Sequence, residues 1–261
     1  MEQGATGEPG LTRIARLTPA TRIDFRRDTG LYELDFLRDD AALLDDVRAC
    51  CALQKRVAQE RLAAFRPNEK ARELVSPAAL EALLRGGAAR SDITTDADLS
   101  DCIVFHAGGL GGSLLDEEVF RLRRRIDARI AAHVAGLFRQ RRGVAAEVSG
   151  HFLYAPGGFM GWHTNSEVPG WRLYVNHAEE AGRSFLRYRD PESGAVVTSW
   201  DAEWSFRLFR IDAGRPFWHA VYAETCRYSF GYRILREPPL LRRGLGRVSR
   251  TLRRLVGAGG G

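Results

Sequence analysis

The sequence predicts a mainly β fold of the α+β class, a sandwich or barrel supported by helices from the N-terminal half. Two observations lead to this prediction. Before Gly143, two segments repeat apolar residues at the spacing of an amphipathic helix, whereas after it the apolar period falls toward two. In addition, the chain has 261 residues, 44% of them hydrophobic, which is long enough to bury one β-rich core.

Helices are predicted at three places before the β-rich half. The first covers Asp39–Phe65, and the second, shorter one opens at Ser76-Pro77 and closes at Gly86. Serine caps a helix well, proline suits its first turn, and glycine ends it. A short strand is expected at 102–106. The long helix 113–141 begins with acidic residues, which suit the helix dipole, and is expected to pack on a sheet.

Strand-like runs fill the second half of the chain. Each is rich in aromatic and β-branched residues, and turn residues separate them. The runs are 147–154, 171–176, 184–188, 196–200, 204–211, 216–222 and 227–235. Asp190–Gly194 is a hairpin turn signal between two of them. So many short strands in succession are typical of a sandwich or barrel.

The positive charge of the chain is confined to its C-terminal segment. Residues 236–261 contain seven arginines and one acidic residue, which account for the whole net charge of +6. The total charge therefore gives no evidence of a basic face for nucleic acid. We expect a flexible tail, whose leucines and valines among arginines at 240–256 leave contact with an anionic membrane open.

Cysteine usage and the absence of long apolar runs predict a cytoplasmic protein. No apolar run is long enough for a transmembrane helix, and residues 1–25 lack the apolar stretch of a signal peptide. The four cysteines include the neighbours Cys50 and Cys51 but no C-x-x-C spacing. We therefore expect reduced thiols and no cysteine zinc site.

Two of the six histidines stand in segments that indicate a site. His163 follows a Tyr- and Gly-rich lead-in within Tyr154-Ala-Pro-Gly-Gly-Phe-Met-Gly-Trp-His-Thr-Asn165, and His219 lies in an apolar strand. Arg227 and Ser229 open the last predicted strand. In extended backbone, residues i and i+2 share a face, so His163 and Asn165 are expected to approach one ion together.

The order of these motifs resembles that of the 2-oxoglutarate/Fe(II)-dependent oxygenases. That family carries a His-x-Asp/Glu pair, then a distal His, then an Arg that often stands in Arg-x-Ser. The resemblance covers about 148–235 and implies a double-stranded β-helix, or jelly roll, with supporting N-terminal helices. It divides the chain into an N-terminal extension packed on the core (1–112), the oxygenase core with its helix (113–235) and the tail (236–261).

The resemblance implies a metal centre and a reaction. His163, His219 and Asn165 would hold Fe(II) on one face of an octahedron, which leaves positions for 2-oxoglutarate and O₂. The implied reaction converts 2-oxoglutarate into succinate and CO₂ and hydroxylates a C–H bond of a small-molecule, carrier-bound or protein-bound substrate. The identity of that substrate is not readable from the sequence, because fold alone does not give function.

The same resemblance implies how the cosubstrate is held. Arg227 would bind the far carboxylate of 2-oxoglutarate through paired charge-assisted hydrogen bonds, with Ser229 and Tyr154 as further donors. Three other side chains are expected to line the substrate side of the pocket. They are Trp162, Tyr174 and Arg233.

One position departs from the family pattern, because Asn165 stands where the family has Asp or Glu. An amide oxygen is a neutral and weaker ligand than a carboxylate. Asn165 itself ligates, or Glu167 takes its place after a backbone turn, or the position is open to a halide, as in related radical halogenases. A non-catalytic, cupin-like binding protein is the remaining alternative.

Overall fold

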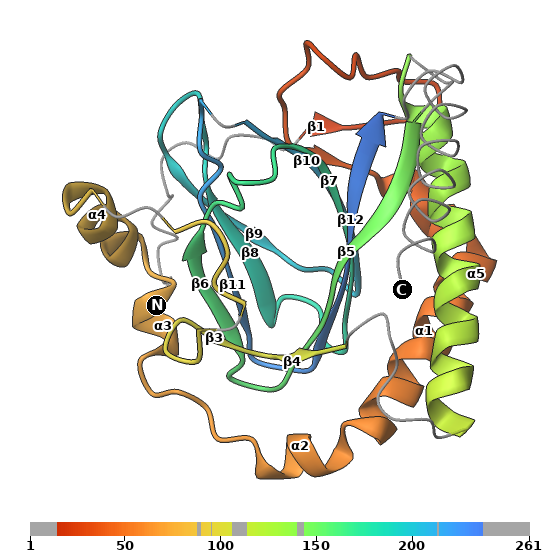
Figure 1. The fold of residues 1–261 in the computed structure, drawn as a ribbon, viewed down its shortest axis with the longest axis horizontal. Coiled ribbons are helices and arrows are strands. Elements are labelled where there is room, and N and C mark those ends of the chain that lie inside the picture. Colours follow the sequence, from red (N-terminus) through yellow and green to blue (C-terminus); the bar gives the residue numbers. More distant parts are fainter. Residues whose placement is uncertain are drawn as a thin grey trace, which may run out of the picture.

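Figure 1 shows two β-sheets that face each other, with helices on their outer sides. This computed structural model describes residues 15–87, 90–94, 96–105, 114–139, 144–212 and 214–236. The predictions for the basic tail from residue 237 onward lie outside the described residues.

The larger sheet has the strand order β1-β2-β10-β7-β12-β5-β4, and the smaller sheet has the order β3-β6-β11-β8-β9. The strands of the larger sheet, in that order, are Ala15–Arg16, Tyr32–Glu33, Trp204–Ile211, Gly170–Ala178, Arg227–Arg236, Val144–Tyr154 and Ile103–Val104. Those of the smaller sheet are Ser100–Asp101, Phe159–His163, His219–Ala223, Ser184–Arg189 and Val196–Trp200.

The strands from β5 to β12 follow the path of a jelly roll. The chain changes sheet at nearly every step: β5, β7, β10 and β12 lie together in the larger sheet, and β6, β8, β9 and β11 lie together in the smaller one. All neighbouring pairs among these strands are antiparallel. This strand order is that of a double-stranded β-helix, so the predicted fold class is confirmed.

The outer face of the larger sheet packs on two long helices, α1 (Ala41–Val57) and α5 (Leu114–Leu137). Side chains at helical spacing on α5, such as Ile126 and Ile130, join one apolar cluster with alternate residues of β12, such as Phe230. Side chains alternate along β12, so the residues that lie between its outward-facing apolar residues point into the space between the two sheets. Most of the apolar core of this half therefore lies outside the sheet.

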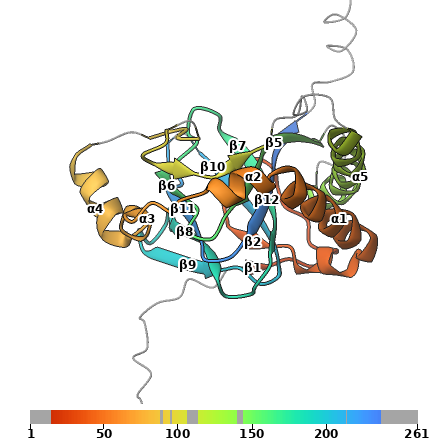
Figure 2. The ribbon, with the colours of Figure 1, turned by 90° about the horizontal axis from the view of Figure 1, so that it is seen from below.

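The smaller sheet is covered by the short helices α3 (Ala71–Leu74) and α4 (Pro77–Arg85), while α2 (Gln59–Ala64) lies between the two helical layers. Leu80 of α4 packs in a second apolar cluster with Trp162 and other residues of the smaller sheet. Seen from below, α1 and α5 lie on one side of the sheets and α3 and α4 on the other (Figure 2).

The predicted helix 39–65 forms as two helices, because the chain breaks its α-helical pattern at Ala58 between α1 and α2. A short 3-10 helix, Asp35–Asp39, precedes α1, and Asp40 caps α1 by accepting from the backbone N–H of Leu43. Ser76 caps α4 by accepting from the N–H of Ala79, as its position before Pro77 predicts.

Strand β6 (Phe159–His163) is missing from the predicted strands, because Gly161 within it and the two glycines before it suggest a turn. Gly161 donates its N–H to the carbonyl oxygen of Leu99 at 2.8 Å, and a Cβ at this position would lie 3.1 Å from that oxygen. The glycine thus marks a close backbone approach inside a strand rather than a loop.

Within the part of the chain that the structure describes, no helix is both long and apolar enough to cross a membrane.

Candidate active site

The structure brings together the two histidines that stand far apart in the sequence. His163 ends β6 and His219 begins β11, and the two residues face each other as partners in the antiparallel ladder. Their ring centroids lie 4.0 Å apart, and both side chains are buried. The register of β6 and β11 therefore creates a pair of imidazoles between the sheets.

Backbone hydrogen bonds fix the chemical form of both rings. Nδ1 of His163 donates to the carbonyl oxygen of Gly161, and Nδ1 of His219 donates to that of Phe217, each at 2.9 Å. Burial lowers the pKa of both histidines, and the neighbouring His163 further lowers the pKa of His219. Both rings are thus neutral with Nε2 unprotonated, which is the form that binds a metal ion.

Asn165 reaches the histidine pair by a turn, so the expectation of extended backbone over 163–165 is wrong. Its φ is 52°, in the left-handed region, and its carbonyl oxygen accepts from the N–H of Val168 at 3.1 Å. Asparagine tolerates this conformation better than most residues. The side-chain Nδ2 donates to Nε2 of His219 at 3.4 Å, which places the amide at the pair.

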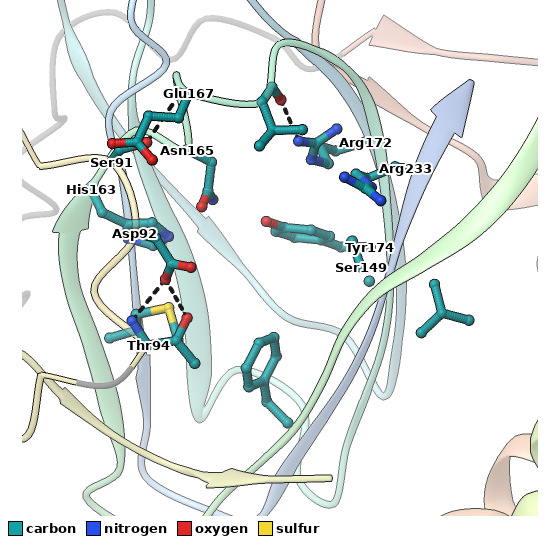
Figure 3. Close-up of a pocket in the computed structure, with 15 residues that line it drawn as sticks. Ser91, Asp92, Thr94, Ser149, His163, Asn165, Glu167, Arg172, Tyr174 and Arg233 are labelled. Carbon is teal, nitrogen blue, oxygen red and sulfur yellow. Dashed lines mark hydrogen bonds between the residues drawn. The ribbon is translucent and has the colours of Figure 1, made fainter. Parts of the chain in front are cut away.

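The same turn carries Glu167 to the rim of a cavity beside His163 (Figure 3). Its side chain is exposed. An extended strand would have carried this carboxylate far beyond the histidine, and the turn removes that obstacle.

A second carboxylate, Asp92, enters the same cavity and is a residue that the sequence analysis missed. The N–H of Asn165 donates to the carbonyl oxygen of Ser91 at 2.8 Å, which holds this loop against the turn after β6. Asp92 lies beside His163 (Figure 3), and its Oδ1 accepts from the N–H and hydroxyl of Thr94 at 2.9 and 2.6 Å. No sequence signal points to it, because its polar neighbours are typical of a surface loop.

Electrostatics keeps Asp92 charged. Burial raises the pKa of this carboxyl, but the two hydrogen bonds from Thr94 and the nearby His163 together lower it below its usual value. The cavity therefore holds a carboxylate at neutral pH, close to the imidazole pair.

The cavity between the sheets has a volume of about 340 Å³. Its lining contains His163, Asn165, Tyr174 and Arg233 from the predicted set. The other lining residues are Ser91, Asp92, Thr94, Val148, Ser149, Phe152, Met160, Glu167, Val168, Arg172 and Gly231. Among the described residues, no three His, Cys, Asp or Glu side chains gather as a set of metal ligands. The candidate ligands at the centre are thus two imidazoles and an amide.

Arg227 begins β12 and lies deeper between the sheets, outside the lining of this cavity. It is 1% exposed, and its Nε donates to Oδ2 of Asp201 at 2.8 Å. Its Nη1 and Nη2 are buried and have no hydrogen-bond partner within the described part of the chain. Its guanidinium carbon lies 5.3 Å from the ring centroid of Tyr154, its partner in the ladder of β5 and β12.

Other polar groups face the same interior. Ser229 shares the inward face of β12 with Arg227 and is paired in register with Asn176 of β7. Both side-chain atoms of the Asn176 amide are buried and lack partners among the described residues. A guanidinium edge and an amide that are left unsatisfied in one interior indicate room for a polar ligand, because such groups are normally paired.

Asp201 holds Arg227 in place through a buried ionic network. This carboxylate also accepts from Nη1 of Arg207 at 2.5 Å and from the hydroxyl of Ser184 at 2.7 Å. Burial raises its pKa, but Arg227 and Arg207 outweigh burial and lower the pKa well below its usual value. Arg227 is thus fixed at Nε, while its Nη1 and Nη2 remain without a partner in the described structure.

Trp162 does not line the cavity, contrary to the prediction from its place beside His163. Its side chain belongs to the apolar cluster between the smaller sheet and helices α3 and α4, and its indole Nε1 donates to the carbonyl oxygen of Ser76 at 2.8 Å. Successive residues of a strand point to opposite faces, so Trp162 faces outward because His163 faces inward.

Comparison with known proteins gives similarity in fold. No protein-family model and no curated protein matches the chain. An oxidoreductase of the 2OG-Fe(II) oxygenase family from Burkholderia pseudomallei is similar at 15% identity and a TM-score of 0.36, over 65% of this chain and 93% of that one.

Two further solved structures are similar in the same way. The dioxygenase for auxin oxidation 1 from Arabidopsis thaliana, in complex with 2-oxoglutarate, matches at 13% identity and a TM-score of 0.41, over 81% of this chain and 87% of its own. A prolyl hydroxylase from Trichoplax adhaerens matches at 12% identity and a TM-score of 0.39, over 78% of this chain and 96% of its own. The fold is identified by the strand order of the chain itself.

The Asp201 network generates a prediction about stability. Asp201→Asn leaves two buried guanidinium groups without their carboxylate and should lower the free energy of unfolding by about 3–5 kcal/mol. Because the folded-state pKa of Asp201 is depressed, its contribution is present above the unfolded pKa of about 4 and is lost as pH falls below it. Urea unfolding between pH 3 and 7 should therefore show a shallower acid dependence in the variant.

Asp45→Asn is the matched control, because Asp45 is exposed and, among the described residues, forms its ion pair with the exposed Arg48. It should change stability by less than about 1 kcal/mol. An Asp201→Asn protein as stable as this control would show that the buried network contributes nothing.

Proposed function

We propose that this chain is an Fe(II)- and 2-oxoglutarate-dependent oxygenase that hydroxylates a C–H bond and releases succinate and CO₂. The observation that carries this proposal is the buried Nη edge of Arg227, which lacks a partner in the described structure and faces the interior that also holds two neutral histidines. A charged, preoriented guanidinium of this kind suits a carboxylate, which it can bind through two parallel hydrogen bonds.

The spacing between the two centres supports a ligand with two ends. Strand β11 runs from His219 to Ala223, about 13 Å at the rise of a strand. Ala223 is paired with Ser184, whose hydroxyl donates to Asp201 beside Arg227. The histidines and the arginine thus lie toward opposite ends of one strand, so that a dicarboxylate with its 2-oxo acid end at the histidines would direct its far carboxylate toward the arginine.

The residues present fit a bound Fe(II) ion, with one departure. His163, His219 and Asn165 would hold it, because neither Nε2 carries a proton and the amide of Asn165 lies 3.4 Å from Nε2 of His219. The hydrogen bond that Nδ2 of Asn165 donates to this nitrogen would be displaced by the metal ion. When bound, iron supplies the activation of O₂ through oxidative decarboxylation of 2-oxoglutarate. The two imidazoles match the facial pattern of such sites, whereas the neutral amide replaces the usual carboxylate.

The protein's own residues orient the cosubstrate. Asp201 fixes the Nε side of Arg227, so that the Nη edge binds the far carboxylate with little loss of side-chain freedom. Burial raises the pKa of the Tyr154 phenol well above its usual value, so this hydroxyl stays protonated and acts as a donor. Ser229 and Asn176 supply further polar groups on the adjacent strands.

The carboxylate absent at position 165 has a candidate replacement in Asp92. It lies beside His163 (Figure 3) and is held by Thr94 in a charged form. Glu167 is the weaker candidate, since its side chain is exposed at the rim. We favour Asn165 as the third ligand, because its amide already contacts His219. A position open to a halide would turn the same scaffold toward halogenation.

The first functional prediction concerns iron. His163→Ala and His219→Ala should each abolish Fe(II) binding, because each removes one of the few ligands, while His177→Ala should retain it. Anaerobic titration with iron measures the stoichiometry, and circular dichroism checks the fold. Wild-type protein loaded with Fe(II) should form succinate from 2-oxoglutarate in air. Undiminished iron in both alanine variants would place the metal site elsewhere.

A second prediction identifies the third ligand. If Asn165 ligates, Asn165→Ala should weaken Fe(II) binding and Asn165→Asp should strengthen it, since a carboxylate replaces a neutral amide. Asp92→Asn and Glu167→Gln should then leave the iron affinity nearly unchanged. The reverse order of effects would assign the position to one of those carboxylates. Chlorinated product in the wild type, lost in Asn165→Asp, would instead show an open position filled by halide.

A third prediction concerns the cosubstrate. Arg227→Ala should weaken 2-oxoglutarate binding about ten- to a hundredfold, because charge-assisted hydrogen bonds contribute roughly 1.5–3 kcal/mol. Iron binding should change little. Calorimetric titration of the anaerobic Fe(II) protein measures both constants. A larger loss in Arg233→Ala than in Arg227→Ala would show that a different arginine binds the cosubstrate.

A further inference from the structure

Two arginines stand directly opposite each other on the inner face of the larger sheet. Arg172 of β7 and Arg233 of β12 are partners in the antiparallel ladder, and both line the cavity that contains His163. Like charges directly opposite on neighbouring strands are destabilising. Such a pair on neighbouring strands needs a negative charge nearby to compensate it. The contacts of the two side chains show how far the protein itself provides that charge.

Arg233 is partly compensated. It forms an ion pair of 2.9 Å with Glu147, its partner on the other side in β5. Half of the Glu147 side chain is exposed, so this pair is screened by water. The Nε atom of Arg233 is nevertheless buried and has no hydrogen-bond partner in the described part of the chain.

Arg172 has no carboxylate partner among the described residues. It is 4% exposed, and its guanidinium donates to the main-chain carbonyl oxygens of Trp171 and Val168. Those bonds orient the group without neutralising it. Burial, opposed in part by Tyr174 and reinforced by Arg233, lowers the pKa of Arg172 from its usual value. A buried charge without a partner is costly, and a bound anion would remove that cost.

The carboxylates of the cavity lie on its other side. Figure 3 shows Asp92 and Glu167 with His163 and Asn165 along the smaller-sheet side, and Arg172 and Arg233 with Tyr174 along the larger-sheet side. Within the described structure neither carboxylate forms an ion pair with Arg172. The cavity therefore has a metal-ligand side and an arginine side that face each other.

The arginine pair is also separate from the Arg227 centre. Arg233 and Arg227 share the inward face of β12 but lie six residues apart, about 20 Å along the strand. The ring of Tyr174, two residues after Arg172 on the inward face of β7, lies between them. One bound dicarboxylate at Arg227 would thus leave the arginine pair without an anion.

We propose that Arg172 and Arg233 form a second anion site, which binds a carboxylate or phosphate group of the substrate and presents the rest of that substrate to the histidine pair. This inference rests on the proposed oxygenase function and specifies its substrate class as anionic. A cavity of about 340 Å³ suits a small organic acid or phosphate ester, or the acidic end of a larger molecule.

The experiment compares matched charged and neutral probes. Calorimetric titration of the wild-type protein should show that benzoate and phenyl phosphate bind at least tenfold tighter than benzamide, which has the ring without the charge. Arg172→Gln and Arg233→Gln should reduce benzoate binding to the level of benzamide, and Arg172→Lys should retain part of it. Arg210→Gln is the matched control, because Arg210 also donates to main-chain carbonyls but lies outside this cavity.

Equal binding of benzoate and benzamide by the wild type would overturn the proposal, as would unchanged benzoate binding in both Arg→Gln variants. If Arg172→Gln fails to fold, Arg233→Gln decides the question, because its side chain is 31% exposed and tolerates replacement better. The choice between benzoate and phenyl phosphate as the tighter probe distinguishes a carboxylate substrate from a phosphate ester.

Titration with 2-oxoglutarate in the same proteins separates this inference from the proposed function. Arg172→Gln should bind 2-oxoglutarate with wild-type affinity. If 2-oxoglutarate binding is lost in Arg172→Gln and kept in Arg227→Ala, the arginine pair is the cosubstrate site and the inference is wrong. If the wild type neither binds 2-oxoglutarate nor forms succinate while benzoate binding still depends on Arg172, the oxygenase function fails and the anion site stands.

Discussion

The two sheets bury most of their apolar side chains on their outer faces, and the rest of the molecule depends on this arrangement. Helices α1 and α5 cover the larger sheet, and α3 and α4 cover the smaller one, so hydrophobic stabilisation comes largely from sheet–helix contacts. The inner faces of the sheets therefore do not need to form a continuous apolar core. They carry charged and polar groups such as Arg172, Arg207 and Arg227, which few protein interiors of this size would tolerate.

Those interior charges differ in how they are satisfied, and the difference indicates their roles. Arg207 donates to Asp201 and to main-chain and hydroxyl oxygens of β9, as expected of a structural group. Arg227 is satisfied on one side only, and Arg172 has carbonyl partners without a counter-charge. Arg227 therefore has hydrogen-bonding capacity left for a ligand, and Arg172 has a charge that an anionic ligand would balance.

Much of the fold could be predicted from the sequence, because strand alternation and helix capping are local signals. Strands β9 and β10 match their predicted bounds, and Ser76 caps α4 as expected. The missed strand β6 and the turn at Asn165 depend on tertiary contacts with the segment before β3 and with the loop at Ser91. Secondary-structure propensity depends on neighbouring residues in the sequence and does not include such contacts, so the glycine in β6 suggested a loop.

The candidate site was predictable where motifs carried it and not elsewhere. Parity along β12 placed Arg227 and Ser229 on one face, and the structure has them so. The prediction placed Trp162 on the cavity side of β6, but neighbouring residues of a strand face opposite ways and His163 is the one that faces inward. Asp92 and Arg172 could not be found, because the first comes from a loop and the second gains significance only from its partner across the sheet.

The left-handed backbone at Asn165 limits which side chains position 165 can carry. Asparagine, aspartate and glycine enter this conformation at little cost, whereas branched and longer residues, glutamate included, are strained there. These three differ in what they would offer a metal: a neutral oxygen, an anionic oxygen, or nothing. The backbone therefore favours a short series of side chains at this position, within which one substitution changes the charge or the openness of the centre and leaves the backbone unstrained.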